Sequence, residues 1–325
     1  MSLNYEKVLI TGITGLLGSW LAEKLLNDGL DVTGIALDHE KDFLLKSKKL
    51  LDRVEISYFD IADEEKIRKH YTTKNFDVVI HLAAQTQVRD ALEDPITTFE
   101  SNIKGTWNLL ENSRRFNRPI VVASSDKAYG VSEKLPYEES FPLKGEYPYE
   151  FSKTATDMLC ATYRTTYDLP VTVLRCGNIY GGGDLNWDRL IPGVARWLIN
   201  KQQPILRTAG QFKRDWVYVE DVVDSYIKLA DALLDEEKDV SYAYNFSSND
   251  YLSVMDIYNK LCDVVIGQYI DPKIEEDSEF EIEDQYLSSD KINKELGIKA
   301  DIGIDEGLSR TIQWYKQNIE LIKEN

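Results

Sequence analysis

The feature that most constrains this fold is a glycine-rich turn close to the N-terminus. Gly12, Gly15 and Gly18 stand in the run Thr11–Gly18, directly after the apolar residues 8–10 and at the start of an amphipathic segment. An apolar run, a glycine turn and an amphipathic segment, in this order, predict a strand, a turn and a helix. Units of this kind build α/β folds with a parallel sheet.

The three glycines have separate physical roles in such a turn. The first permits the tight turn, the second lets the backbone approach a pyrophosphate, and the third lets helix and strand pack closely. The helix N-terminus then offers N–H groups and the positive end of its dipole to phosphate. We therefore predict a dinucleotide site formed by Gly12, Thr14, Gly15, Leu16, Leu17 and Gly18.

Acidic residues after the next two strands indicate which dinucleotide binds. Asp38 follows the predicted strand 32–37, twenty residues after Gly18. A carboxylate there can accept hydrogen bonds from the adenosine ribose and repels a 2′-phosphate, which predicts NAD rather than NADP. An ordinary surface charge is the alternative. Asp60 and Ile61 follow the third strand, where they either contact the adenine or begin a helix.

Short apolar runs alternate with amphipathic stretches over the first two thirds of the chain. This alternation predicts a Rossmann-type, doubly wound α/β fold with a parallel sheet. The predicted strands are 8–10, 32–37, 54–59, 78–82, 120–123 and 171–174, and the predicted helices are 18–27, 62–70, 96–116 and 148–167. The pattern changes at residue 180. We expect an NAD-binding domain at 1–180 and a smaller, mainly substrate-binding domain at 181–325, with about 212–248 returning to the first.

The acidic balance of the chain excludes several partners. There are 38 Lys and Arg against 56 Asp and Glu, a formal net charge of −18, whereas nucleic acids and anionic membranes attract a basic face. The cysteines Cys160, Cys176 and Cys262 share no metal-type spacing, and we expect no metal site. No run of about 18 apolar residues predicts a membrane span, and the first strand leaves no room for a signal peptide. We expect a cytoplasmic protein.

A second candidate site combines a helix face with the end of a strand. Tyr149 and Lys153 are four residues apart in the predicted helix 148–167 and so share one face. A nearby ammonium favours the phenolate, which makes the tyrosine a usable base. Ser125–Lys127 follow the strand 120–123, and ligands of doubly wound sheets bind at the carboxyl ends of strands. A solvated helix face and a simple turn are the alternatives for these two segments.

Together with the glycine turn, six motifs make this chain resemble the extended short-chain dehydrogenase/reductase family, in particular its nucleotide-sugar 4,6-dehydratases. They are His81–Gln85, Ser101–Thr106, Ser125–Lys127, Tyr149–Lys153, Arg175–Gly181 and Arg214–Asp221. Several stretches are most similar to the CDP-glucose 4,6-dehydratase group, among them Gly18–Leu21 and Gly181–Asp184. Arg214–Tyr218 instead resembles the dTDP-glucose enzymes.

The resemblance implies a redox-neutral elimination that converts a nucleotide-diphosphate hexose into its 4-keto-6-deoxy product and water. It implies that Tyr149 takes the C4 hydroxyl proton, Ser125 binds the C4 oxygen, and Lys153 binds the nicotinamide ribose and tunes Tyr149. Many relatives carry an adjacent Asp–Glu pair as acid and base. Here Asp126 becomes the candidate acid for the C6 hydroxyl, and Lys127 becomes the candidate base at C5. That base role needs desolvation and nearby positive charge, and an ordinary salt bridge is the alternative.

The resemblance also implies binding contacts and an assembly. The candidate cofactor contacts are Leu82, Ala83 and Ala84, and the candidate diphosphate, ribose or sugar contacts are Arg89, Asn178, Arg189 and Arg214. A surface salt bridge is the alternative for Arg189. The helices 96–116 and 148–167 would pair with a second copy in a four-helix bundle, giving a homodimer. Their large side chains are Phe99, Trp107, Leu110, Met158, Leu159 and Tyr163, and packing on their own sheet is the alternative.

Two other functions compete with the dehydratase. A nucleotide-sugar epimerase or C4 oxidoreductase needs Ser125, Tyr149 and Lys153 but no acid beside the serine, so Asp126 favours the dehydratase. A non-catalytic NAD-binding protein is a remote alternative, because the serine, tyrosine and lysine are all present.

Overall fold

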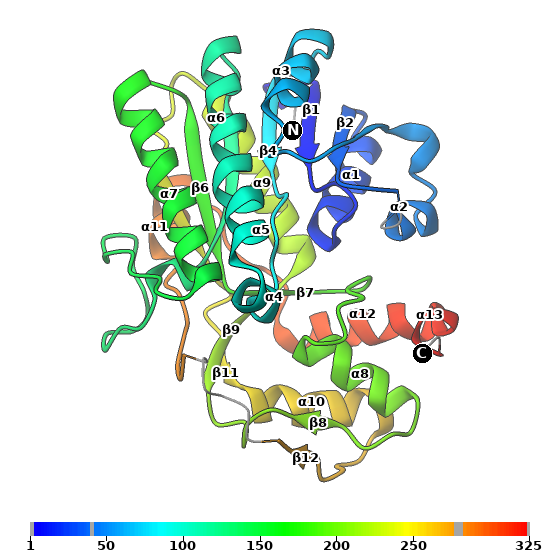
Figure 1. Ribbon diagram of the computed structural model, residues 1–325. Coiled ribbons are helices and arrows are strands. Elements are labelled where there is room, and N and C mark those ends of the chain that lie inside the picture. The colour runs from blue at the N-terminus through cyan, green and yellow to red at the C-terminus, as the bar shows by residue number, and fades with distance from the viewer. Residues whose placement is uncertain (1–2, 40–41, 276–281, 324–325) are drawn as a thin grey trace.

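The computed structural model describes residues 3–39, 42–275 and 282–323 (Figure 1). The strands are β1 (Lys7–Thr11), β2 (Asp31–Ala36), β3 (Glu55–Tyr58), β4 (Val78–His81), β5 (Ile120–Ser125), β6 (Val171–Cys176), β7 (Asn178–Tyr180), β8 (Ile205–Leu206), β9 (Lys213–Tyr218), β10 (Ala243–Phe246), β11 (Tyr251–Ser253) and β12 (Lys273–Ile274).

The α-helices are α1 (Leu16–Asn27), α2 (Phe43–Ser47), α3 (Glu64–Thr73), α4 (Val88–Glu93), α5 (Pro95–Phe99), α6 (Gly105–Phe116), α7 (Pro148–Tyr167), α8 (Leu190–Ile199), α9 (Val219–Leu234), α10 (Val254–Ile266), α11 (Asp290–Leu296), α12 (Ile304–Gln317) and α13 (Ile319–Lys323). Short turns of other helical types are η1 (Leu51–Arg53), η2 (Glu100–Lys104) and η3 (Asp126–Tyr129).

Seven strands form one central sheet in the order β10-β6-β5-β4-β1-β2-β3. Every neighbouring pair in this sheet is parallel. The strand order reverses beside β1, so the carboxyl ends of β1 and β4 flank the position where doubly wound sheets bind their ligands. The predicted Rossmann-type fold is confirmed.

Alternating side chains of the strands enter two hydrophobic cores. In β1, Val8 and Ile10 pack on the side of α1 and α9, whereas Leu9 packs on the side of α3, α6 and α7. These two helical layers cover the two faces of the sheet in Figure 1. Burial on both faces is the physical reason for the near-continuous apolar strands in the sequence.

A smaller unit lies below the central sheet in Figure 1. It contains the three-stranded sheet β11-β9-β7, the two-stranded sheet β12-β8 and the helices α8, α10 and α12. Val194, Leu261 and Leu308 are fully buried in its core. The chain returns from this unit to the central sheet, because α9 packs on β4, β5 and β6 and β10 pairs with β6.

The predicted helix 96–116 differs from the structure, which divides it into α5, a π-helical turn (η2) and α6. Within that turn, the Asn102 side chain accepts a hydrogen bond from Gln85 N (2.7 Å) and donates to Gln85 O (2.9 Å) and Ser152 Oγ (2.9 Å). A π turn adds one residue to the helix and changes the direction of its side chains. The amide of Asn102 thereby ties the loop after β4 to α7.

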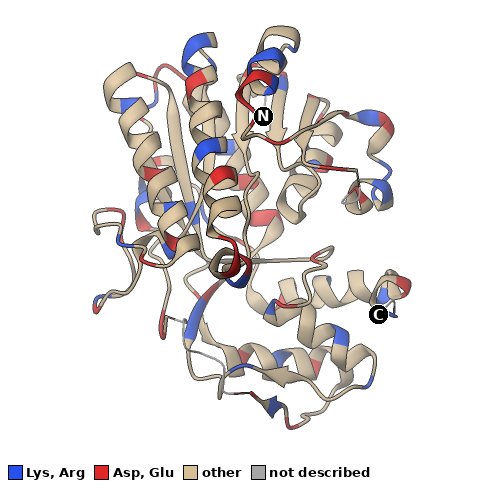
Figure 2. Ribbon diagram, in the orientation of Figure 1, with Lys and Arg blue, Asp and Glu red and all other residues tan. Residues whose placement is uncertain are grey.

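Acidic and basic residues are interspersed over the helices and loops (Figure 2). None of the helices in the described part of the chain combines the length and apolar character that crossing a bilayer requires. Across the same residues, His, Cys, Asp and Glu side chains form no group of three or more that could hold a metal ion.

Candidate active site

The glycine turn joins β1 to α1 at the centre of the sheet. Gly12 has a φ of +71°, a conformation that side-chain-bearing residues rarely adopt. A Cβ on Gly12 would lie 2.8 Å from Ala83 N, and one on Gly18 would lie 2.3 Å from Gly12 O. At both positions, backbone atoms therefore occupy the space that a side chain would need. This agrees with the predicted tight turn and the predicted close packing of helix and strand.

The N-terminus of α1 forms a cradle lined by backbone. Its N-cap residue, Gly15, is exposed and supplies no side-chain cap, and Thr14, Leu16 and Leu17 beside it are half-buried. The first N–H groups of a helix lack intrahelical partners, and a Cβ on Gly15 would lie 3.3 Å from Gly12 O. The cradle fits the pyrophosphate of a dinucleotide.

The loop after β4 lies against this turn. The backbone N–H groups of Leu82 and Ala83 both donate to Thr11 Oγ1, at 3.2 Å each. Ala84 follows and is half-buried. The structure thus brings the predicted cofactor contacts 82–84 together with the glycine turn.

His81 closes the same strand end as a packed, neutral group. Its Nδ1 lies 2.7 Å from Thr11 Oγ1 and its Nε2 lies 2.9 Å from Thr106 Oγ1. Burial, with a smaller contribution from the Lys153 charge, lowers the pKa of His81 to about 3.

The residues predicted for the adenosine end lie after β2 and β3. Asp38 is half-buried, two residues beyond β2. Asp60 Oδ1 accepts a hydrogen bond from Ala62 N (2.9 Å), which makes it a turn residue, while the N-cap of α3 is Asp63. Ile61 is buried, and a Cβ on Gly105 of α6 would lie 2.5 Å from its side chain.

Ser125, Asp126 and Lys127 stand where β5 passes into η3. Ser125 Oγ donates to Asp126 Oδ1 (2.9 Å) and accepts from Lys127 N (3.2 Å). The carboxyl group of Asp126 is buried, and burial raises its pKa, although the Lys127 charge and the hydrogen bond from Ser125 act in the opposite direction. A buried carboxyl group with a raised pKa can hold a proton for delivery, which suits a general acid.

Tyr149, in the first turn of α7, lies near Ser125 and Asp126. Burial and the Asp126 carboxyl raise the pKa of Tyr149 to about 12, while a hydrogen bond with Ser125 and the Arg189 charge act to lower it. The phenol is therefore protonated in the protein alone. A positively charged ring beside it would lower that pKa and favour the base form.

Lys153 lies one helical turn further along α7 and is almost fully buried. Its Nζ donates to Ala123 O in β5 (3.1 Å). Burial lowers the pKa of Lys153 to about 8, although the coulombic effects of Cys160 and Asp157 oppose this. The predicted helix 148–167 has the bounds of α7, so the tyrosine and lysine share one face as expected.

Lys127 lies near two carboxyl groups. Its charge opposes the burial that raises the pKa of Asp126 and of Glu150, whereas the role of a base needs nearby positive charge. Its Nζ also donates to Gln285 Oε1. The neighbouring carboxyl groups arise because Glu150 follows Tyr149 on the buried side of α7, a position that the spacing of Tyr149 and Lys153 does not reveal.

The predicted substrate contacts are distributed around this centre. Asn178 Nδ2 donates to Asp215 O (3.4 Å). Arg189 forms an ion pair with Asp184 (3.0 Å), and its charge acts to lower the pKa of Tyr149. The guanidinium of Arg214 is buried and donates to backbone carbonyl groups of the segment after residue 281. Arg89 is exposed on α4.

Four residues of this region were absent from the sequence-based set of candidates. They are Asn102, Glu150, Asp215 and Gln285. Asp215 is fully buried, and its Oδ2 accepts from Leu287 N (3.3 Å); burial raises its pKa to about 7. Asn102 and Asp215 stand inside motifs that carry the family resemblance, whereas Gln285 lies in an acidic stretch without any local signal.

Residues 8–245 match the family model described as "NAD dependent epimerase/dehydratase family". The chain belongs to this family. A CDP-glucose 4,6-dehydratase of Salmonella typhimurium is 33% identical over 328 residues, covering 96% of this chain and 90% of that protein. A UDP-glucuronate 4-epimerase of Thermodesulfobacterium geofontis is 29% identical over 330 residues, covering 97% and 98%.

Solved structures show the same fold. A UDP-glucose 4-epimerase of Thermotoga maritima matches with a TM-score of 0.87 at 24% identity, covering 96% of this chain and 99% of that one. A dTDP-glucose 4,6-dehydratase of Bacillus anthracis, solved with NAD, matches with a TM-score of 0.85 at 23% identity, covering 97% and 98%.

The family assignment and the site agree on the cofactor and on the class of enzyme. The protein is an enzyme of the NAD-dependent nucleotide-sugar dehydratase/epimerase class, and NAD is its cofactor, as predicted. The backbone of the glycine turn and of the loop 82–84 fits the dinucleotide.

Proposed function

We propose that this enzyme is a nucleotide-sugar 4,6-dehydratase and that its substrate is CDP-glucose. The observation that carries the proposal is the carboxyl group of Asp126, which is buried and has a raised pKa. It accepts a hydrogen bond from Ser125 and lies near Tyr149. Neither an epimerase nor a C4 oxidoreductase needs a proton donor beside the serine. The 33% identity to a CDP-glucose 4,6-dehydratase supports the choice of substrate.

Each side chain has one task in the proposed reaction. The glycine turn and the loop 82–84 would hold NAD, which would supply reversible hydride transfer for C4 and C6 of the sugar. Tyr149 takes the C4 hydroxyl proton, with Ser125 bonded to the C4 oxygen, and Lys153 orients the ribose of the cofactor. Asp126 delivers its proton to the departing C6 oxygen as the C5–H bond breaks, so that water leaves. Lys127 is the candidate acceptor of the C5 proton.

The substrate's nucleotide diphosphate would lie between the two units. We propose that residues 1–180, with about 212–248, bind NAD and that 181–325 mainly bind the nucleotide sugar. Arg189 supports this arrangement. It lies at the start of α8 and forms an ion pair with Asp184, and its charge acts to lower the pKa of Tyr149. Asn178, Arg214 and Arg89 complete the proposed contacts.

A panel of CDP-, dTDP-, GDP- and UDP-hexoses tests the reaction. We expect a product lighter by one water, formed with catalytic NAD and without net growth of reduced-cofactor absorbance. A product of unchanged mass with inverted stereochemistry would identify an epimerase instead. Reduced cofactor in proportion to substrate would identify a dehydrogenase.

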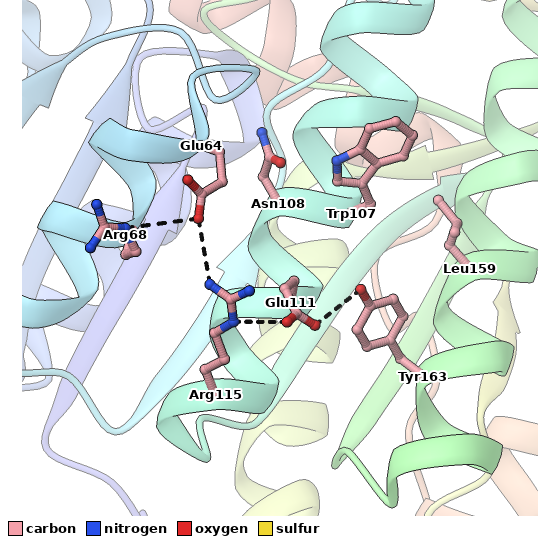
Figure 3. A pocket seen from close by; sticks show the side chains of 8 residues that line it. All are labelled: Glu64, Arg68, Trp107, Asn108, Glu111, Arg115, Leu159 and Tyr163. Atoms are coloured by element: carbon pink, nitrogen blue, oxygen red, sulfur yellow. Dashed lines mark hydrogen bonds and ion pairs between the residues drawn. The ribbon is translucent and has the colours of Figure 1, made fainter.

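We also propose a homodimer through the outer face of α6 and α7. Trp107 and Met158 are 45% and 60% exposed there, beside a groove of about 690 Å³. Figure 3 shows this groove, which is lined by Glu64, Arg68, Trp107, Asn108, Glu111, Arg115, Leu159 and Tyr163. Leu110, expected among the interface side chains, is instead buried in the protein's own core, because it faces the sheet. Light scattering tests the proposal: Met158→Glu should shift the mass toward a monomer, and a concentration-independent monomer in the unaltered protein would contradict it.

A further inference from the structure

The segment that begins at residue 282 is fixed against β9. The Arg214 guanidinium donates to Ile282 O (2.7 Å) and Glu283 O (2.5 Å). Gln285 N donates to Lys213 O (3.1 Å). These bonds hold the backbone of the segment in one position, so the Gln285 side chain starts from a rigid base.

The side chain of Gln285 is bonded at both ends. It is fully buried; its Oε1 accepts a hydrogen bond from Lys127 Nζ, and its Nε2 donates to Asp126 O (3.3 Å). A buried amide without partners is costly. Here the amide oxygen binds the Lys127 amine, while the amide nitrogen binds the backbone carbonyl of Asp126 and the side chain also bonds to Tyr137.

Lys127 has a particular need for such a partner. Its side chain has four rotatable bonds, and ordering them costs conformational entropy. The carboxyl groups of Asp126 and Glu150 also attract its charge, and close pairing with either would fix the amine on that carboxyl group. A neutral amide oxygen can hold Nζ without the ion pairing that favours the protonated amine, which cannot act as a base.

We propose that Gln285 is a positioning residue that holds Lys127 Nζ for proton transfer at C5 of the sugar. The proposal rests on the proposed dehydratase function. Gln285 comes from the last fifth of the chain and Lys127 from the end of β5. The sugar end of the site is therefore completed by a segment far from the Rossmann motifs.

Gln285→Met tests the proposal, because it keeps the length of the side chain and removes both polar ends. We expect exchange of the C5 hydrogen with solvent deuterium, and loss of water, to fall about tenfold or more, since small displacements of a reacting group have effects of this size. Oxidation at C4 in a single turnover should stay within about twofold, because the hydrogen bonds of the Gln285 side chain go to Lys127 and to the backbone of Asp126 rather than to Tyr149 or Ser125.

Asp284→Ala is the matched control in the same segment. It removes the hydrogen bond from Lys213 N to Asp284 Oδ1 (2.8 Å) and leaves the bond between Gln285 and Lys127 in place. Both steps should stay close to their original rates. If Asp284→Ala slows C5 exchange as much as Gln285→Met does, the effect is general loosening of the segment and the positioning role is wrong.

Gln285→Glu tests whether the neutral amide matters. It keeps an oxygen for Lys127 but adds a third carboxyl group beside Asp126 and Glu150. Because this favours the protonated amine, C5 exchange should stay slow near neutral pH and recover toward the original rate as the pH rises. Exchange in the Glu variant that equals the original rate near neutral pH would overturn the proposal. If the Met variant does not fold, Gln285→Asn, whose amide cannot reach, takes its place with the same expectation.

The Lys127 signal, observed by NMR with labelled lysine, tests the contact itself without turnover. Its titration and chemical shift should change in Gln285→Met and not in Asp284→Ala, and an unchanged signal in Gln285→Met would overturn the proposal. If the original protein releases no water from any nucleotide hexose, the proposed function fails while this signal still tests the contact.

Discussion

The two ends of the site are constructed in different ways. The cofactor end is made of backbone: Gly12 and Gly18 leave no room for a Cβ, and the loop 82–84 bonds to Thr11 through N–H groups. The sugar end is made of side chains with altered pKa values, such as Asp126 and Tyr149. The cofactor end depends on shape, so substitutions that add side-chain volume should disrupt it. The sugar end depends on the proton affinity of its side chains, so substitutions that remove a single atom should change its chemistry.

Tyr149→Phe gives the sharpest test at the sugar end. It removes one oxygen from a buried side chain and leaves the ring, so binding of NAD should be unchanged. The opening oxidation should fall at least 10²–10⁴-fold, as is typical for the loss of an acid–base group. Single-turnover absorbance of reduced cofactor measures this step. An oxidation rate near the original would remove Tyr149 from the chemistry.

Asp126→Asn should act at a later step. It keeps the shape of the side chain but removes the proton that the C6 oxygen needs. C4 oxidation should persist, while release of water falls about 10²-fold or more. Stopped-flow absorbance together with mass analysis of the product separates the two steps. Equal slowing of both would show that Asp126 serves mainly to hold Ser125.

The same substitution has a stability effect whose sign follows from the raised pKa of Asp126. The folded protein keeps this proton to a higher pH than the unfolded chain does, so proton binding stabilises the fold fully at low pH. That contribution is lost as the pH rises through the pKa of the folded state. Asn cannot ionise, so Asp126→Asn should gain stability relative to the original as the pH rises, measured as the free energy of unfolding across a pH series.

The success of the sequence-based predictions also differs between these two ends of the site. The glycine turn depends on neighbours a few residues apart, and its strand, helix and cofactor were all predictable. The helix 148–167 was predicted with the bounds of α7 because its amphipathic pattern is unbroken. Both features are local, so local patterns suffice.

The parts that were missed depend on contacts between distant segments. Gln285 meets Lys127 across 158 positions, and Asn102 in the π turn η2 bonds to Gln85 and Ser152, which are 17 and 50 positions away. Neither contact leaves a periodic signal. Glu150, the second carboxyl neighbour of Lys127, was missed for the same reason, since its burial is a property of the folded chain.

A pair of glycine substitutions tests the shape of the cofactor end. Gly12 and Gly29 both have positive φ, but a Cβ on Gly29 meets nothing within 4 Å, whereas one on Gly12 would meet Ala83 backbone. Gly29→Ala should cost about 1–2 kcal/mol of unfolding free energy from backbone strain alone. Gly12→Ala should cost more and weaken NAD binding as well, measured by denaturant unfolding and calorimetry. Equal costs would mean that the turn and the loop 82–84 separate easily.

Asp38 carries the smallest expected effect, because it is a charge at the rim of an end otherwise made of backbone. It is half-buried beyond β2, and its carboxylate repels a 2′-phosphate while accepting hydrogen bonds from ribose hydroxyls. Asp38→Asn keeps the shape and removes the charge, so the preference for NAD over NADP should fall about tenfold, or about 1.4 kcal/mol, with little change in stability. Titration calorimetry with both cofactors measures this ratio, and the repulsion should weaken with added salt because the group is partly exposed. Equal affinity of the original protein for NADP and NAD would show that Asp38 does not select between the two cofactors. Shape alone would then account for binding at the cofactor end.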